Sequence, residues 1–89
     1  MRTAEEKVPG GKLVRVTVRK DGAVEITGDF FAHPEDGIVL VENALILLDG
    51  TESPVEVETL LNRIIVEAGI ELLGIDVPVI VRLYRQCDR

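Results

Sequence analysis

Few side chains in this sequence have the types and spacing that chemistry requires. His33, beside Pro34 and Glu35, carries the ring nitrogens of a general base, and Cys87 carries a thiol. A lone histidine ahead of a predicted helix is more often a cap or a surface residue, and a lone cysteine is more often an apolar filler. No nucleophile stands at a spacing that pairs it with a base. We therefore expect no catalysis by this chain alone.

Phosphate and metal sites have equally little support. Gly10, Gly11 and Lys12 form a stretch that is too short for a phosphate-binding loop, and it precedes a predicted strand instead of a helix. A flexible entry to that strand is the simpler interpretation. One His and one Cys provide too few soft ligands for a structural zinc ion or an iron–sulfur cluster. We expect this chain alone to bind no metal and no cofactor.

The composition predicts one globular domain. The chain has 89 residues, of which 46% are hydrophobic and 29% charged, and no apolar run approaches the ~18 residues of a membrane span. Aromatic residues make up only 3%, which excludes a nucleic-acid surface built on base stacking. Residues 1–11 are polar and end in Pro9, Gly10 and Gly11, so they predict a flexible lead-in to a domain over residues 12–89.

The charge is unevenly distributed along the chain. Residues 1–20 hold six Lys or Arg against two Glu, whereas residues 21–77 hold thirteen acids against Arg63 alone. Such an acidic middle repels nucleic acid and anionic membranes, and we expect neither as a partner. With a single cysteine and no apolar signal segment at the start, the sequence predicts a cytoplasmic protein.

Alternating apolar and polar residues between Lys12 and Phe31 predict a β-hairpin. A two-residue turn would place a charged residue opposite Val18, whereas a three-residue loop, Lys20–Gly22 with Gly22 left-handed, places Val18 opposite Val24. The sequence therefore predicts the three-residue loop.

Two helices are predicted after the hairpin. Pro34–Asp36 has the character of a first helical turn, and a wide apolar stripe, indicating burial on two sides, then runs to Asp49 and Gly50. Ser53–Glu56 places a capping hydroxyl, a proline and a glutamate at the spacing of a capping box, and Gly69 stands where a left-handed C-terminal cap belongs.

The C-terminal part leaves an alternative open. Residues 70–74 predict a short third strand, and Asp76 could cap a last helix with Ile80, Leu83, Tyr84 and Cys87 on one face. A terminal strand over residues 77–87 is the competing interpretation, because several valines favour it. The fold class is α+β: a small antiparallel sheet of two or three strands with two or three helices on one face.

The segment Gly28–Phe31 departs from the alternating pattern, because an acid and two adjacent aromatics end the strand. Adjacent strand residues face opposite sides. Even alternation assigns Phe30 to the core with Val24 and Ile26, and assigns Phe31 to a partner surface or a helix entry.

Two segments resemble the small accessory domain of lipoate–protein ligases: KVPGGKLVRV (Lys7–Val16) and ITGDFFAHPED (Ile26–Asp36). In that family the domain begins with a KVPGGKL-like segment, forms a hairpin leading into an ITGDFF…HPE stretch and continues into helices, so the resemblance covers nearly the whole chain. The domain is fused behind the catalytic domain in many bacterial ligases and is a separate chain in others. With Met1 only a few residues before the first segment, this sequence is similar to the separate form.

The resemblance implies a partner that supplies the active site. In the family, the catalytic large subunit binds lipoate, ATP and Mg, forms lipoyl-AMP and transfers the lipoyl group to a lysine of an acceptor protein. The small domain is required for activation, and Lys12 is the candidate electrostatic helper on this chain. The expected partner interface comprises Gly28, Asp29, Phe31, His33 and Pro34. Lipoate, octanoate and biotin remain open as the physiological acid, as does the acceptor protein.

The ITGDFF region also suggests kinship with iron–sulfur scaffold folds, although no cysteine stands there to hold a cluster. The alternative function is therefore a non-enzymatic adaptor or carrier-binding module of similar fold, docking through Phe30 or Phe31 onto a different protein.

Overall fold

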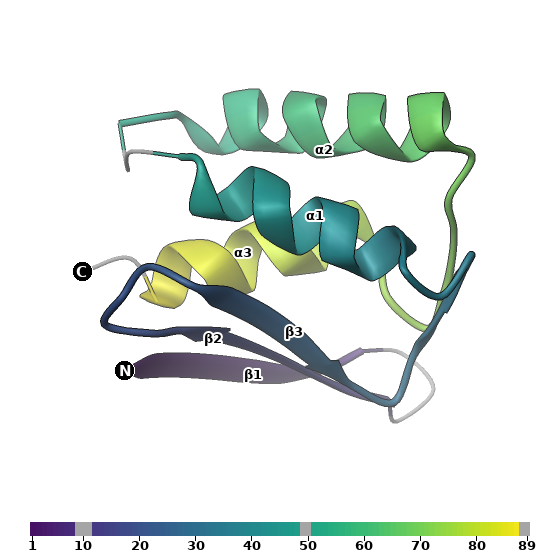
Figure 1. Cartoon of the computed structure of the whole chain (residues 1–89). Coiled ribbons are helices and arrows are strands. Elements are labelled where there is room, and N and C mark those ends of the chain that lie inside the picture. Colours follow the sequence, from purple (N-terminus) through teal and green to yellow (C-terminus); the bar gives the residue numbers. More distant parts are fainter. Residues whose placement is uncertain (9–11, 49–50, 88–89) are drawn as a thin grey trace.

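The computed structural model describes residues 1–8, 12–48 and 51–87, and these form two small antiparallel sheets and a set of helices (Figure 1). The first sheet has the strand order β1-β2-β3, and β4 pairs with β5 in the second. This arrangement confirms the α+β class and the N-terminal hairpin. In chain order the elements are β1 (Arg2–Val8), β2 (Lys12–Val18), β3 (Val24–Gly28), β4 (Phe31–His33), α1 (Gly37–Ile46), α2 (Pro54–Ala68), β5 (Glu71–Leu73) and α3 (Val77–Cys87).

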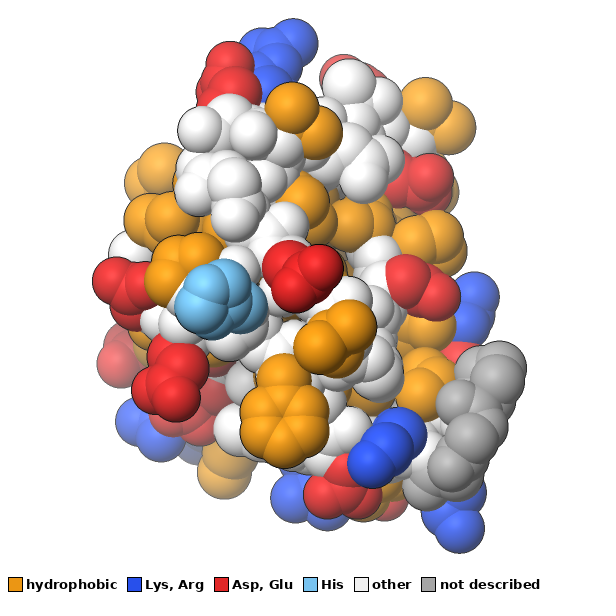
Figure 2. Space-filling view, turned by 90° about the vertical axis from the view of Figure 1, so that its right-hand side faces the viewer, with side chains coloured by type: hydrophobic (Ala, Val, Ile, Leu, Met, Phe, Trp, Pro, Cys, Tyr) orange, Lys and Arg blue, Asp and Glu red, His pale blue; other side chains and the backbone are white. Residues whose placement is uncertain are grey.

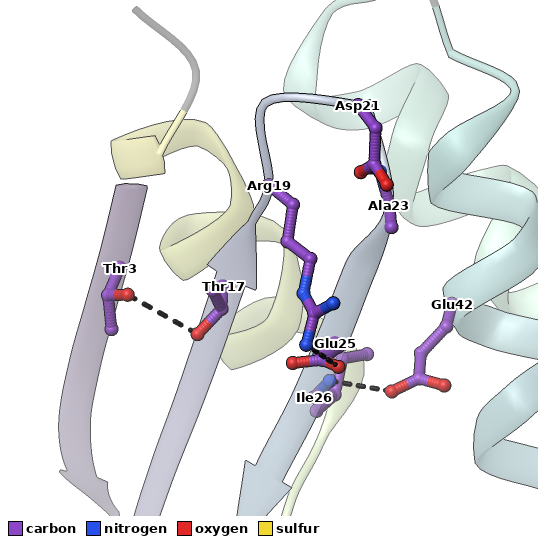
Figure 3. Close-up of polar contacts among 8 residues, drawn as sticks. All are labelled: Thr3, Thr17, Arg19, Asp21, Ala23, Glu25, Ile26 and Glu42. Carbon is purple, nitrogen blue, oxygen red and sulfur yellow. Dashed lines mark hydrogen bonds and ion pairs between the residues drawn. The ribbon is translucent and has the colours of Figure 1, made fainter. Parts of the chain in front are cut away.

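The hairpin has the predicted register. Val18 lies opposite Val24 and Val16 opposite Ile26, so these apolar side chains share the face of the sheet that the helices cover. The Arg19 N–H donates to the Ala23 carbonyl at 2.8 Å, which closes a three-residue loop, and Gly22 has a φ of 92°. The Asp21 carboxylate accepts the Ala23 N–H at 3.0 Å and fixes the turn (Figure 3).

The prediction of a flexible lead-in is wrong for residues 2–8. They form β1, which pairs with the whole of β2 from Arg2 opposite Val18 to Val8 opposite Lys12. Ala4 and Val8 are buried, and Glu6 on the same side of the strand receives a hydrogen bond of 2.9 Å from the Arg82 guanidinium of α3. That hydrogen bond lowers the pKa of Glu6. The sequence pattern does not reveal this strand, because the middle one of its inward-facing residues is a glutamate instead of an apolar residue. Residues 9–11 of the predicted lead-in lie outside the described residues.

The helices form two layers on one face of the larger sheet (Figure 1). α3 packs on β1 and β2, α1 packs on β3, and α2 contacts both helices from the side away from the sheet. The side chains that are almost completely excluded from solvent come from β2 and from α1, α2 and α3: Val14, Val16, Val41, Leu45, Val57, Leu61, Ile80 and Leu83. The core is therefore aliphatic, as the lack of aromatic residues requires.

α1 begins later and is less buried than predicted. Pro34–Asp36 forms a turn, closed by the Gly37 N–H donating to the Pro34 carbonyl at 2.8 Å, and the helix starts at Gly37. Gly37 lies against Ile70, which leaves no room for a side chain. The helix ends at Ile46, and Asp49 and Gly50, its predicted end, lie outside the described residues. Only one side of the wide stripe is covered, because Val39, Leu40 and Ile46 are exposed.

The other two helices agree with their sequence signals. Ser53 and Glu56 form the capping box of α2, and Gly69 ends that helix with a φ of 66°. The Asp76 carboxylate accepts the Val79 N–H at 3.0 Å at the start of α3, so residues 77–87 are helical and the alternative of a terminal strand is wrong. No helix among the described residues is long and apolar enough to cross a bilayer.

Glu42 of α1 protects the free edge of the larger sheet. The Ile26 N–H of edge strand β3 donates to the Glu42 carboxylate at 2.7 Å (Figure 3). Partial burial raises the pKa of Glu42, and the nearby charge of Glu25 raises it further against the opposing effect of the hydrogen bond. The folded chain therefore binds this proton more tightly than the unfolded chain, and this contribution to stability decreases as pH rises through the raised pKa.

Replacement of Glu42 by glutamine tests that contribution. The amide oxygen can still accept from Ile26 without a partly buried charge, so we expect the melting temperature of Glu42→Gln relative to the unmodified chain to increase between about pH 4 and about pH 7. Glu42→Ala loses the acceptor and should be less stable by about 1 kcal/mol at both pH values. Parallel melting curves for the unmodified chain and Glu42→Gln across this range would contradict the assignment.

Candidate functional site

The two segments of the family resemblance lie side by side in the structure. Val14 of β2 is the register partner of Gly28 at the end of β3, and the Asp29 N–H continues the pairing by donating to the Leu13 carbonyl at 2.8 Å. This is the end of the larger sheet away from the hairpin turn (Figure 1). We call it the motif end, and define it by Lys12–Val14 and Gly28–Asp29.

Gly28 makes this close approach possible. Its φ is 141°, a conformation that residues with a side chain rarely adopt. A Cβ added there would lie 2.1 Å from the Leu13 carbonyl oxygen, a backbone atom that cannot move aside like a flexible side chain. The glycine of the ITGDFF segment therefore has a structural role in joining the two segments.

Beyond Asp29 the chain leaves the larger sheet and forms a second surface, the β4–β5 ribbon. Phe31 lies opposite Leu73, and His33 lies opposite Glu71. Residues directly opposite each other in an antiparallel pair, and residues two apart on a strand, share one face. These four side chains therefore form one outer face of the ribbon, and all four are exposed. Leu72 belongs to the opposite face and packs against the core.

All five residues of the expected partner interface are exposed along one stretch of chain. Gly28 and Asp29 belong to the motif end, Phe31 and His33 belong to the ribbon, and Pro34 follows directly. Phe30 packs against the core whereas 72% of Phe31 is exposed, which agrees with the predicted separation of the two aromatics.

Lys12, the candidate electrostatic helper, is the exposed first residue of β2 and adjoins Leu13 at the motif end. The residues before it in the glycine-rich stretch lie outside the described part of the chain.

Sequence reasoning missed the contribution of β5 to this surface. Residues 70–74 were predicted as a strand, but Glu71 and Leu73 could not be assigned to a partner strand. Their pairing with β4 joins positions about forty residues apart in the sequence. The available signal was Glu71 between the apolar residues Ile70 and Leu72, which indicates an exposed face, whereas the apolar Leu73 gives no such signal.

No group of three or more His, Cys, Asp or Glu among the described residues is arranged to hold a metal ion, and that part of the chain buries no polar or charged side chain. Cys87 lies in the core, where its thiol donates to the Val16 carbonyl at 3.3 Å and burial raises its pKa. His33 stands on the exposed ribbon beside Glu71, with neither a nucleophile nor a closed pocket described around it.

Two hollows of the described structure lie elsewhere. One of about 290 Å³ opens near the hairpin turn between Arg2, Lys20 and the apolar side chains of Leu45 and Tyr84. The other is a shallow groove between α2 and α3, lined by Pro54, Arg82 and their neighbours. Neither is lined by residues of the motif end or the ribbon.

Comparison of the chain with protein-family models, with curated proteins and with solved structures found no match.

The contact between the two segments can be tested by replacing Gly28 with alanine. We expect the free energy of unfolding to fall by more than about 2 kcal/mol, because both the positive φ and the Leu13 carbonyl oppose a Cβ. Gly69→Ala is the matched control: its φ is also positive, but an added Cβ meets no atom within 4 Å, so the loss should be about 1 kcal/mol. Equal losses in urea unfolding would show that the close approach imposes no constraint.

Proposed function

We propose that this chain is the accessory subunit of a two-chain lipoate–protein ligase. It acts with a separate catalytic subunit in the ATP-dependent activation of lipoate to lipoyl-AMP, before the lipoyl group is transferred to a lysine of an acceptor protein. The observation that carries the proposal is the meeting of the two family-like segments at the motif end, where Asp29 bonds to Leu13 and Gly28 has room for no side chain.

The placement of the exposed residues adds support. The segment that resembles ITGDFF leaves the sheet directly after this contact and presents Phe31 and His33 outward. Resemblance and exposure therefore coincide on one surface, as expected for a domain that acts by contacting another protein. The helices behind this surface hold it in place through the aliphatic core.

In this proposal the catalytic subunit binds lipoate and ATP with Mg. A lipoate carboxylate oxygen attacks the α-phosphorus of ATP, the bond to the bridging oxygen breaks, and pyrophosphate leaves. Both reacting groups are anionic, so a subunit that closes over them, excludes water and adds a cation lowers the barrier. Lys12, exposed beside the motif end, is the side chain proposed to supply that cation.

The proposal also fixes the cellular context. In the proposed reaction, the chain meets acceptor proteins only through the catalytic subunit. Because the reaction uses ATP, the proposed location of the chain is the cytoplasm. Nucleic acid and membrane have no part in it, in keeping with the acidic middle of the sequence.

A second candidate function is an adaptor or carrier-binding module without enzymatic activity, with a fold like that of iron–sulfur scaffolds but without a cluster. The exposed Phe31 favours it, since such a side chain suits docking on any protein partner. The two candidates differ in whether the chain changes the rate of an adenylation reaction.

Separate assays of lipoate activation and of lipoyl transfer distinguish the two candidate functions. We expect the chain alone to form no lipoyl-AMP, and the catalytic subunit to require the chain for ATP-dependent pyrophosphate release with lipoate. Transfer from pre-made lipoyl-AMP should proceed without it, because the lysine amine attacks the lipoyl carbonyl carbon and AMP leaves, so no bond to phosphorus is formed or broken. Equal dependence of both half-reactions on the chain, or no effect on either, would reject the proposed role.

The role of Lys12 has its own test within the same assay. Lys12→Ala should slow activation by about 10²-fold while the two chains still associate, and Lys12→Arg should retain most of the rate, because a preorganised charge acts in the closed site. Lys20→Ala, which removes an exposed lysine from the hairpin turn at the other end of the sheet, is the control and should have no effect. An unchanged activation rate in Lys12→Ala would leave that lysine without a role.

A further inference from the structure

The outer face of the ribbon carries a compact apolar pair. Phe31 and Leu73 lie directly opposite each other on β4 and β5, with 72% and 55% of their surfaces exposed. Side chains in such pairs are close neighbours, with Cβ atoms about 5 Å apart, so the two form one apolar knob instead of two scattered residues. Ala32 and Leu72, on the other face of the ribbon, are partly buried and hold it against the body of the domain.

Acidic side chains are the only fully charged side chains in the two segments that make up this surface. Residues 28–36 contain three acids and residues 69–76 contain two, and neither segment contains Lys or Arg. All five acids are exposed: Asp29, Glu35, Asp36, Glu71 and Asp76. Figure 2 shows this side of the molecule, with acidic side chains near the histidine and the exposed apolar side chains.

Four of these acids, Asp29, Glu35, Asp36 and Glu71, form no ion pair among the residues that the structure describes, whereas Asp76 accepts the Val79 N–H at the start of α3 and interacts electrostatically with Arg82. The ion pairs among the described residues join Glu5 to Arg15, Glu25 to Arg19 and Glu6 to Arg82, all on or against the larger sheet. The negative potential around Phe31 and Leu73 is therefore available to a partner, although Lys12 lies close by at the motif end.

The charge distinguishes this surface from the other exposed apolar face. Val39 and Leu40 of α1 and Leu47 directly after it are also exposed, but nothing in the described structure indicates what would cover them. An apolar knob with an acidic border, by contrast, is complementary to one kind of site: an apolar pocket whose rim carries Lys or Arg.

We propose that the outer face of the β4–β5 ribbon inserts Phe31 and Leu73 into an apolar pocket with a basic rim on the catalytic subunit. This inference rests on the proposed function and specifies the chemistry of its partner. The apolar pair supplies the anchor that slows dissociation, and the acidic border orients the encounter and accelerates association. His33 lies opposite Glu71 on the same face, next to the apolar pair along β4.

The test measures binding of the chain to the catalytic chain of a lipoate–protein ligase that lacks its own accessory domain, by calorimetry at low and high salt. Phe31→Ser and Leu73→Ser should each weaken association about tenfold, with melting curves close to that of the unmodified chain because both side chains are exposed. Asp29→Lys together with Glu71→Lys should weaken association at low salt and reduce its salt dependence.

Matched controls lie on α2. Val66→Ser removes an equally exposed apolar side chain, and Glu58→Lys reverses a charge in the half of α2 that is remote from the ribbon (Figure 1). Neither should change the affinity by more than about twofold.

The possible outcomes distinguish a failure of the ribbon as the docking surface from a failure of the proposed function. If the unmodified chain binds the catalytic chain and stimulates activation, but Phe31→Ser and Leu73→Ser bind as tightly as it does, the ribbon is not the docking surface. Binding that increases with salt would contradict the basic rim. If the unmodified chain neither binds nor stimulates, the proposed function itself fails, and with it the partner assigned to the ribbon.

Discussion

The register between β2 and β3 is the constraint on which the rest of this structure depends. The three-residue loop at Lys20–Gly22 aligns Val16 with Ile26, so the apolar side chains of both strands face the helices. A shift by one residue would turn the apolar side chains of β3 toward solvent and leave α1 without a surface to pack on. The same register brings Gly28 to Val14 and Asp29 to Leu13, so the geometry of the core and that of the motif end are set by one turn.

Local signals in the sequence predicted the parts of the fold that depend on neighbouring residues. The capping box of Ser53 and Glu56, which lie within four residues of the sequence, marks the start of α2, and the single hydrogen bond from the Val79 N–H to the Asp76 carboxylate marks the start of α3. β1 could not be found like this, because its inward Glu6 is compensated by Arg82, which lies 76 residues away in the sequence. A strand whose charged residue is satisfied from the far end of the chain has no local pattern to reveal it.

The candidate site, like the fold, could be predicted from the sequence only where local residues determine it. The sequence identified Gly28, Asp29 and Phe31, because a glycine, an acid and paired aromatics interrupt a regular strand. It could not identify Leu73 and Glu71, since their place on the outer face follows only from the pairing of β5 with β4. The irregular residues after β3 show where the chain leaves the larger sheet. The outer face of the ribbon, however, is completed by β5, which follows α1 and α2 in the sequence.

The different environments of Phe30 and Phe31 separate the packing of the domain from the proposed docking surface. Phe30 packs on the aliphatic core, so the segment stays in position even when the outward side chain has no partner. Phe31 contributes little to that packing, and the acids around it are hydrated in the free chain. The surface can therefore be specialised for a partner through side chains on which folding does not depend. Conversely, the glycine at position 28 cannot vary without moving both the sheet and the surface that begins beside it.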